Sequence, residues 1–173
     1  MVGIPPAQYG IQYKRVAAFQ GDVNIHAARR LASQAWSVHN VSAYSYLFDV
    51  VEPGAAPKAG PYAVANHGSE IPYVFDNKDA VGKNADEKLK EGTLRRRRRL
   101  STAMSRMWIS FVTTLNPCTP REFGVKWPVY DHNDPEIMFF GLNVTGLTQV
   151  ESDVYRAEGI KYISDRLEST FEH

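Results

Sequence analysis

The sequence predicts a protein of the α/β class, and three observations carry this prediction. Residues 41–51 are dense in aromatic and β-branched side chains and end at Glu52-Pro53-Gly54, as a buried strand does. Apolar residues recur at helical spacing over residues 22–39 and again over residues 100–115. Strand and helix patterns therefore alternate along a chain of 173 residues, which is long enough for one ordinary domain.

Each predicted helix has its own boundary signals. Asp22 is a suitable N-cap for the first helix, which we expect to end near His39. The long second helix is expected after the polar, loop-like stretch 76–92 and ends at Asn116-Pro117, because proline interrupts helical hydrogen bonding. A last helix is predicted over residues 153–171. One face of the long helix carries its apolar side chains: Leu100, Met104, Met107, Trp108, Phe111 and Leu115.

Only one further strand is predicted, over residues 137–142. Residues 53–66 are expected to form a loop, residues 126–130 a proline-bent aromatic turn, and residues 1–20 a linker-like start. Two strands cannot make a stable open sheet, because their faces and edges lack neighbours. We therefore expect residues 1–173 to form a single partial domain that another stretch of polypeptide completes.

Composition excludes several classes of protein. Twenty Lys and Arg against nineteen Asp and Glu leave a net charge of +1, too small to hold the whole chain on nucleic acid or an anionic membrane. No apolar run reaches the ~18–20 residues that span a bilayer, and residues 1–10 lack the apolar core of a signal peptide. Cys118 is the single cysteine, and no CxxC or Cys/His cluster offers a zinc site, so we expect no metal.

The run of arginines at residues 95–99 allows a different interpretation, because basic clusters can be nuclear signals or nucleic-acid patches. The run leads directly into the long helix, where its side chains are distributed around the helix and Glu87 and Glu91 are close enough to pair with it. Interleaved aromatic residues and overall basicity are both missing. We therefore predict a solvated helix start and no nucleic-acid partner.

One histidine, His67, follows a predicted strand at the position where α/β proteins commonly carry functional residues. His67 follows the predicted strand on a glycine-flanked loop, and ligands of open α/β sheets bind beyond the carboxyl ends of the strands. Several blocks, in order and spacing, make the chain resemble the C-terminal third of the type B carboxylesterase family, the cholinesterase and fungal lipase group. These blocks are Gly21-Asp22 with Arg29-Arg30, residues 44–49, 67–75, 107–111 and 127–130. The pattern HGxEIPxVF at residues 67–75 is the most specific of them.

The resemblance implies that the chain is the C-terminal part of an α/β-hydrolase fold, a partial sheet with packed helices. It implies that His67 is the base of a catalytic triad, which takes a proton from a serine hydroxyl and returns it to the leaving alcohol. Glu70 receives a supporting role as a hydrogen-bonding neighbour, not as the triad acid. The alternatives are an ordinary surface histidine and an ordinary solvated glutamate. The implied substrate is a small-molecule carboxylic ester, no cofactor is needed, and secretion follows if the full family pattern holds.

The chain departs from the family at the nucleophile. Triad order in this fold is Ser, then Asp or Glu, then His, so both partners of His67 must come before it. None of the upstream serines has the glycines of a GxSxG elbow: Ser33, Ser37, Ser42 and Ser45. The upstream acids match other family positions: Asp22, Asp49 and Glu52. We therefore expect the chain alone to be catalytically silent until an N-terminal part supplies the serine and the acid.

Two other hypotheses remain open from the sequence. Some cholinesterase-like proteins keep the fold without the chemistry, so a non-catalytic interaction module is the main alternative. Nucleic-acid binding through residues 95–99 is the weaker one. The sequons at Asn40 and Asn143 matter only in the secretory route.

Overall fold

The computed structural model describes residues 10–51, 64–77, 90–117 and 125–171. Its contacts divide the chain into two compact units, which are taken in turn. Unit 1 comprises Met1–Ser45, Val129–Ile137 and Ser152–His173. Unit 2 comprises Tyr46–Pro128 and Met138–Glu151. The predicted loop at 53–66 lies mostly, and Cys118 entirely, outside the described residues.

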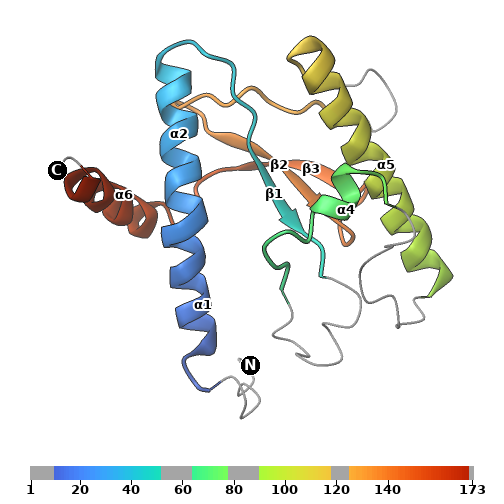
Figure 1. The fold of residues 1–173 in the computed structure, drawn as a ribbon, viewed down its shortest axis with the longest axis horizontal. Coiled ribbons are helices and arrows are strands. Elements are labelled where there is room, and N and C mark those ends of the chain that lie inside the picture. Colours follow the sequence, from blue (N-terminus) through green and yellow to red (C-terminus); the bar gives the residue numbers. More distant parts are fainter. Residues whose placement is uncertain (1–9, 52–63, 78–89, 118–124, 172–173) are drawn as a thin grey trace. The chain divides into compact units, whose positions relative to one another are not determined.

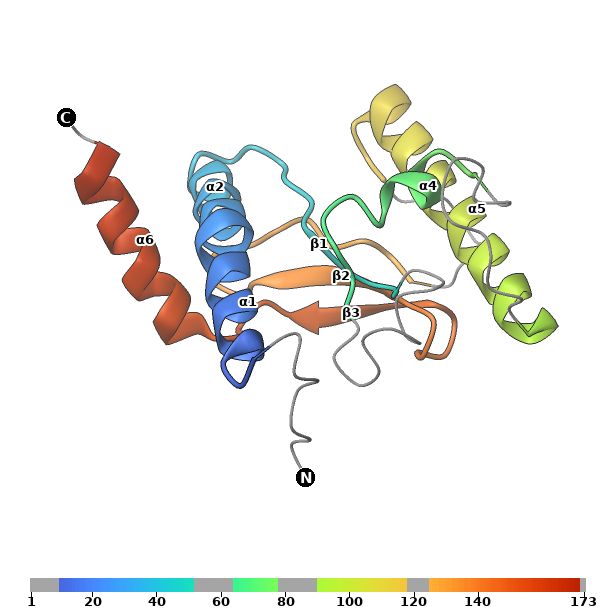
Figure 2. The ribbon, with the colours of Figure 1, turned by 60° about the horizontal axis from the view of Figure 1, so that its bottom comes forward.

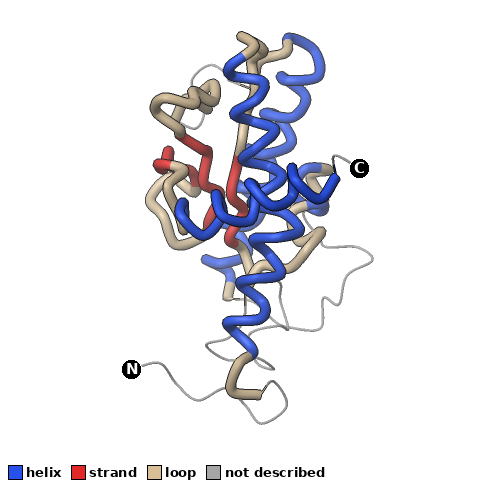
Figure 3. The backbone as a smooth tube through the Cα atoms, turned by 90° about the vertical axis from the view of Figure 1, so that its left-hand side faces the viewer, coloured by secondary structure: helices blue, strands red, loops and turns tan. Residues whose placement is uncertain are grey.

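Unit 1 begins with a long helical rod. The α-helix α1 (Tyr13–Gly21) continues through a π-helical turn, η2 (Asp22–His26), into the α-helix α2 (Ala27–Val38), as Figures 1 and 3 show. The predicted end near His39 is confirmed, but Asp22 is not an N-cap, because the helix is already formed before it. Residues 13–20, expected in a linker-like start, are helical.

A buried carboxylate organises unit 1. Asp153 is 4% exposed and accepts two hydrogen bonds of 2.8 Å from Arg29, two of 3.2 and 2.8 Å from Arg30, and one of 3.0 Å from the Tyr130 hydroxyl. The last helix, α6 (Ala157–Phe171), begins later than the predicted residue 153, because Arg156 directly before it has φ of +49°, which a right-handed helix cannot include. Figure 2 shows α6 and α2, which are in contact.

The ionisation of Asp153 makes unit 1 sensitive to acid. Burial by itself raises the pKa of this carboxyl, but the hydrogen bonds and charges of Arg29 and Arg30 outweigh burial and lower the pKa from 3.8 to about 2. A depressed folded-state pKa contributes stability that is present above the unfolded value and is lost as the pH falls through the folded one. Because the ion pairs are buried, this contribution is not screened by solvent as a surface pair is.

We expect unit 1 to lose about 2 kcal/mol of unfolding free energy between about pH 4 and pH 2 through Asp153. The measurement is a series of urea titrations across this range, performed on the wild-type chain and on Asp153→Asn. The pH slope of the wild type should exceed that of the variant. Equal slopes would show that Asp153 is not the titrating group.

Unit 2 is built on a three-stranded sheet in the order β1-β2-β3. The strand β1 (Tyr46–Asp49) runs parallel to β2 (Glu136–Gly141), with Tyr46 opposite Met138. The strand β3 (Thr148–Ser152) lies beside β2 after a short connection, as Figure 2 shows. The prediction at 137–142 is therefore confirmed within a residue, whereas β3 was missed.

The first strand is much shorter than the predicted 41–51. Its preceding residues are used differently: the Ala43 carbonyl accepts a 2.8 Å hydrogen bond from the Tyr130 amide, and the Ser45 hydroxyl accepts one of 2.9 Å from Arg29. Only residues 46–49 pair with a neighbouring strand. Composition thus located the strand but not its length.

The long helix α5 (Glu91–Thr114) packs its central turns into unit 2. Leu100, Met104 and Met107 are buried, as predicted, but Phe111 and Leu115 are exposed, because they lie at the helix end beyond the packed turns. The helix ends where Leu115 takes the left-handed conformation, directly before Asn116-Pro117. None of the helices in the described segments is long and apolar enough to cross a membrane.

Aromatic side chains complete the core of unit 2. Ring centroids lie 5.3 Å apart for Tyr46 and Trp108, 5.3 Å for Trp127 and Phe140, and 6.0 Å for Tyr46 and Phe140. Such edge-to-face pairs each add ~0.5–1.5 kcal/mol to area burial. The two tryptophans are therefore packing anchors, as the sequence indicated.

Candidate active site

The candidate histidine lies in unit 2, beyond the carboxyl end of β1. His67 is exposed, in the turn at 67–70. The chain reaches this turn from Val51, and the helix α4 (Ile71–Val74) follows it directly. Figures 1 and 2 show α4 between β1 and α5. An exposed imidazole at this end of a parallel strand is accessible to a reacting group on another segment.

The turn that carries His67 is held by its own backbone and by one buried hydroxyl. The Asn66 amide donates to the Ser69 hydroxyl at 3.0 Å, and the Ser69 amide donates to the Asn66 carbonyl at 3.0 Å. Ser69 is 1% exposed, so its bond is shielded from water. Gly68 has φ of +79°, a conformation that other residues adopt only with strain, which explains the glycine of the HGxEIPxVF pattern.

Glu70 is the residue that precedes α4, and it is half-buried. Its carbonyl accepts hydrogen bonds from the amides of Tyr73 and Val74 at 2.9 and 3.1 Å, which close the single turn of α4. Burial, and after it the negative charge of Glu70, raises the pKa of the Tyr46 phenol on β1. The carboxylate therefore acts electrostatically on the strand that leads to His67.

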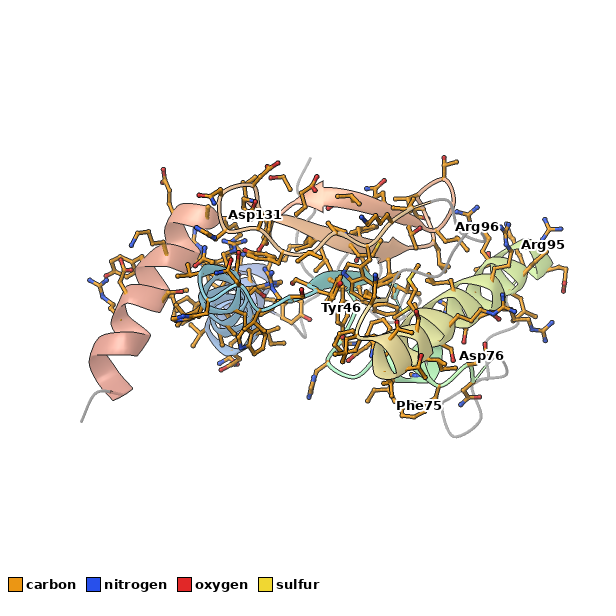
Figure 4. The ribbon with its side chains drawn as sticks, turned by 90° about the horizontal axis from the view of Figure 1, so that it is seen from above. Tyr46, Phe75, Asp76, Arg95, Arg96 and Asp131 are labelled. Carbon is orange, nitrogen blue, oxygen red and sulfur yellow. The ribbon has the colours of Figure 1, made fainter. Side chains whose placement is uncertain are left out.

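Two arginines of the 95–99 run are used inside unit 2, contrary to a purely solvated helix start. Arg96 donates to the carbonyls of Leu142 and Val144, on the connection between β2 and β3. Arg97 donates to the Tyr73 hydroxyl at 2.9 Å and to the Val51 carbonyl at 2.5 Å. The other arginines of the run, Arg95, Arg98 and Arg99, are exposed. Figure 4 shows Arg95 and Arg96 on α5. The helical spacing of the apolar residues could have predicted the inward position of Arg97. Leu100 and Met104 follow it by three and seven residues, so Arg97 continues the buried face of the helix.

The upstream serines and acids occupy structural positions. Ser33 and Ser45 are buried in unit 1, and Asp22 forms an ion pair with Arg156. Asp49 is exposed at the end of β1, opposite Gly141 in the sheet register. Glu52 lies outside the described residues. Ser33, Ser45 and Asp22 are therefore used in the packing of unit 1.

The solved structures with a similar fold are carboxylesterases of the α/β-hydrolase class. This chain therefore forms a part of an α/β-hydrolase fold. A structure titled PNB esterase superimposes with a TM-score of 0.63 at 23% identity over 89% of this chain and 28% of the other. The carboxylesterase of Geobacillus stearothermophilus at pH 6.2 superimposes with a TM-score of 0.65 at 20% identity over 90% and 29%.

The chain belongs to the carboxylesterase family, whose profile matches residues 6–158. The para-nitrobenzyl esterase of Bacillus subtilis (strain 168) is 30% identical over 115 residues, which are 66% of this chain and 21% of that protein. The fumonisin B1 esterase of Sphingopyxis macrogoltabida is 32% identical over 131 residues, 75% of this chain and 22% of that protein. The chain therefore spans about a fifth of the length of these curated relatives.

Proposed function

We propose that this chain is the histidine-bearing part of a serine carboxylic ester hydrolase, with residues 1–173 forming a single partial domain. The observation that carries the proposal is His67 itself, an exposed imidazole on a hydrogen-bonded turn after parallel strand β1, within the HGxEIPxVF pattern. Family membership and two esterase relatives support it. The nucleophilic serine and the triad acid would come from a further segment of polypeptide, because no GxSxG precedes His67 in the sequence.

The reaction follows from the chemistry of an imidazole. His67 accepts the proton of the serine hydroxyl while the serine oxygen bonds to the ester carbonyl carbon. The tetrahedral intermediate collapses when the imidazolium returns that proton to the departing alcohol, leaving an acyl-serine. Water repeats the sequence and releases the carboxylic acid. In this scheme Glu70 keeps the supporting role of a hydrogen-bonding neighbour, and its backbone carbonyl accepts the hydrogen bonds that close α4 directly after the turn.

The test is to restore a complete hydrolase around the chain. The full chain is joined to the part of the Bacillus subtilis para-nitrobenzyl esterase that precedes the region it matches, and para-nitrophenyl acetate is the probe. We expect this joined protein to hydrolyse the probe ~10³-fold or more faster than either part alone, because only the joined protein contains serine, acid and histidine. A joined protein that melts cooperatively but turns over no faster than its parts would contradict the proposal.

A further inference from the structure

A single guanidinium links the residues directly after β1 to the helix α4, which follows the turn that carries His67. Val51 is the second residue after β1, and Tyr73 lies six residues beyond His67 in α4. Arg97 of α5 donates to the carbonyl of the first at 2.5 Å and to the hydroxyl of the second at 2.9 Å. The two nitrogens of one planar fork thus fix the spacing between the point where the chain leaves the sheet and the point where it re-enters a helix.

Further contacts make this anchor rigid. Tyr73 is 8% exposed, and its ring lies 5.1 Å from that of Phe48 on β1. The Tyr73 carbonyl accepts a hydrogen bond of 3.4 Å from Ser101, and Asp76 accepts one of 3.2 Å from Thr102. Figure 4 shows Phe75 and Asp76 close to α5. His67 itself remains exposed, whereas Tyr73, six residues after it, is fixed by these contacts.

Arg97 holds this position at a cost. Its Nε atom is buried and has no hydrogen-bond partner among the described residues. A buried polar atom left unpaired calls for a compensating role. The blocks that carry the resemblance to the family do not include residues 95–99.

We propose that Arg97 is a positioning residue for His67, which sets the reach of the imidazole toward its serine by fixing Tyr73 and, with it, the helix α4 that directly follows the turn. The inference rests on the proposed function of His67. Misplacing a catalytic group by about 1 Å costs ~10²-fold in rate. The side chain acts through the turn and has no contact with the ester.

The test compares three variants in the joined protein. Arg97→Met keeps the unbranched apolar stem without the donors, Arg97→Lys keeps the charge without the planar fork that reaches both acceptors, and Arg95→Met removes an exposed arginine from the same helix. Rates are normalised to reactive serines titrated to completion with a fluorophosphonate, so unfolded protein is not counted. We expect Arg97→Met to lower kcat by up to ~10²-fold with KM within about twofold, Arg97→Lys to recover part of the loss, and Arg95→Met to match the wild type.

A second measurement follows the turn directly in the 173-residue chain. Amide hydrogen exchange at residues 69–75 should accelerate in Arg97→Met and stay unchanged in Arg95→Met. If His67→Gln abolishes turnover but Arg97→Met equals Arg95→Met in kcat, the positioning role is wrong and the proposed function stands. If His67→Gln leaves turnover intact, the proposed function fails first. A parallel rise in KM and fall in the number of titratable serines, with kcat per serine unchanged, would assign Arg97 to structure alone.

Discussion

His67→Gln in the joined protein is expected to lower kcat for para-nitrophenyl acetate by ~10⁴-fold or more. Glutamine is close to histidine in size but cannot accept and return a proton at neutral pH, so the serine loses its base. The exposed position of His67 means that little packing is disturbed, and the melting temperature should stay near that of the parent. The measurement is steady-state release of para-nitrophenolate.

Two controls separate the role of His67 from general effects. His39→Gln replaces another exposed histidine and should retain parental turnover. Glu70→Gln should leave kcat near the parental value, because the backbone carbonyl through which Glu70 closes α4 is unchanged in this variant and its side chain takes no part in proton transfer. Parental turnover in His67→Gln would refute the assignment of the base. A loss in Glu70→Gln as large as that in His67→Gln would refute its supporting role.

Asp153→Asn is expected to reduce the free energy of unfolding by about 3–5 kcal/mol. The substitution keeps the shape of the side chain but removes the negative charge that two guanidinium groups share. Arg30, which is 7% exposed, would then be a buried cation without its counter-ion. Urea denaturation of the full chain, followed by circular dichroism, measures the change.

The matched control is an exposed ion pair in the same unit. Lys161 and Asp165 lie one turn apart in α6, with 2.7 Å between Nζ and Oδ1, and both side chains are largely exposed. Asp165→Asn should cost no more than ~0.5 kcal/mol, because exposed pairs gain little in water. Equal losses for the two variants would mean that the Asp153 cluster is no stronger than a surface pair.

The sequence predicted the class of fold because local patterns carry it. Aromatic and β-branched density located β1, and helical spacing located α2 and the buried turns of α5. Strand lengths and the polar strand β3, with the sequence Thr-Gln-Val-Glu-Ser, depend on which neighbours pair with them, and pairing is a long-range property. Similarly, Gly21-Asp22 has the composition of a helix start, but the helix passes through it.

The sequence motif predicted the candidate site residues, but not the residues that hold the turn in place. The HGxEIPxVF pattern pointed to His67 and Glu70, whereas Arg97 was hidden in a run of identical residues. Because the five residues are identical, their types do not distinguish inward from outward positions on the helix. Only the helical spacing of Arg97 from the buried Leu100 and Met104 indicates that it points inward. Asp153 was missed for a different reason: its partners Arg29 and Arg30 lie more than a hundred residues away in the chain.

The π-helical turn at Asp22–His26 has a consequence for how this helix tolerates insertions and deletions. Such a turn accommodates an extra residue within a continuous helix. Deleting one residue there would restore regular α-helical winding, but it would also rotate everything upstream by about 100° relative to α2. Tyr13, Ala18 and Gly21, the half-buried residues of α1, would then face a different direction. Length changes in homologous chains should therefore be found before Tyr13 or after Val38, and rarely between them.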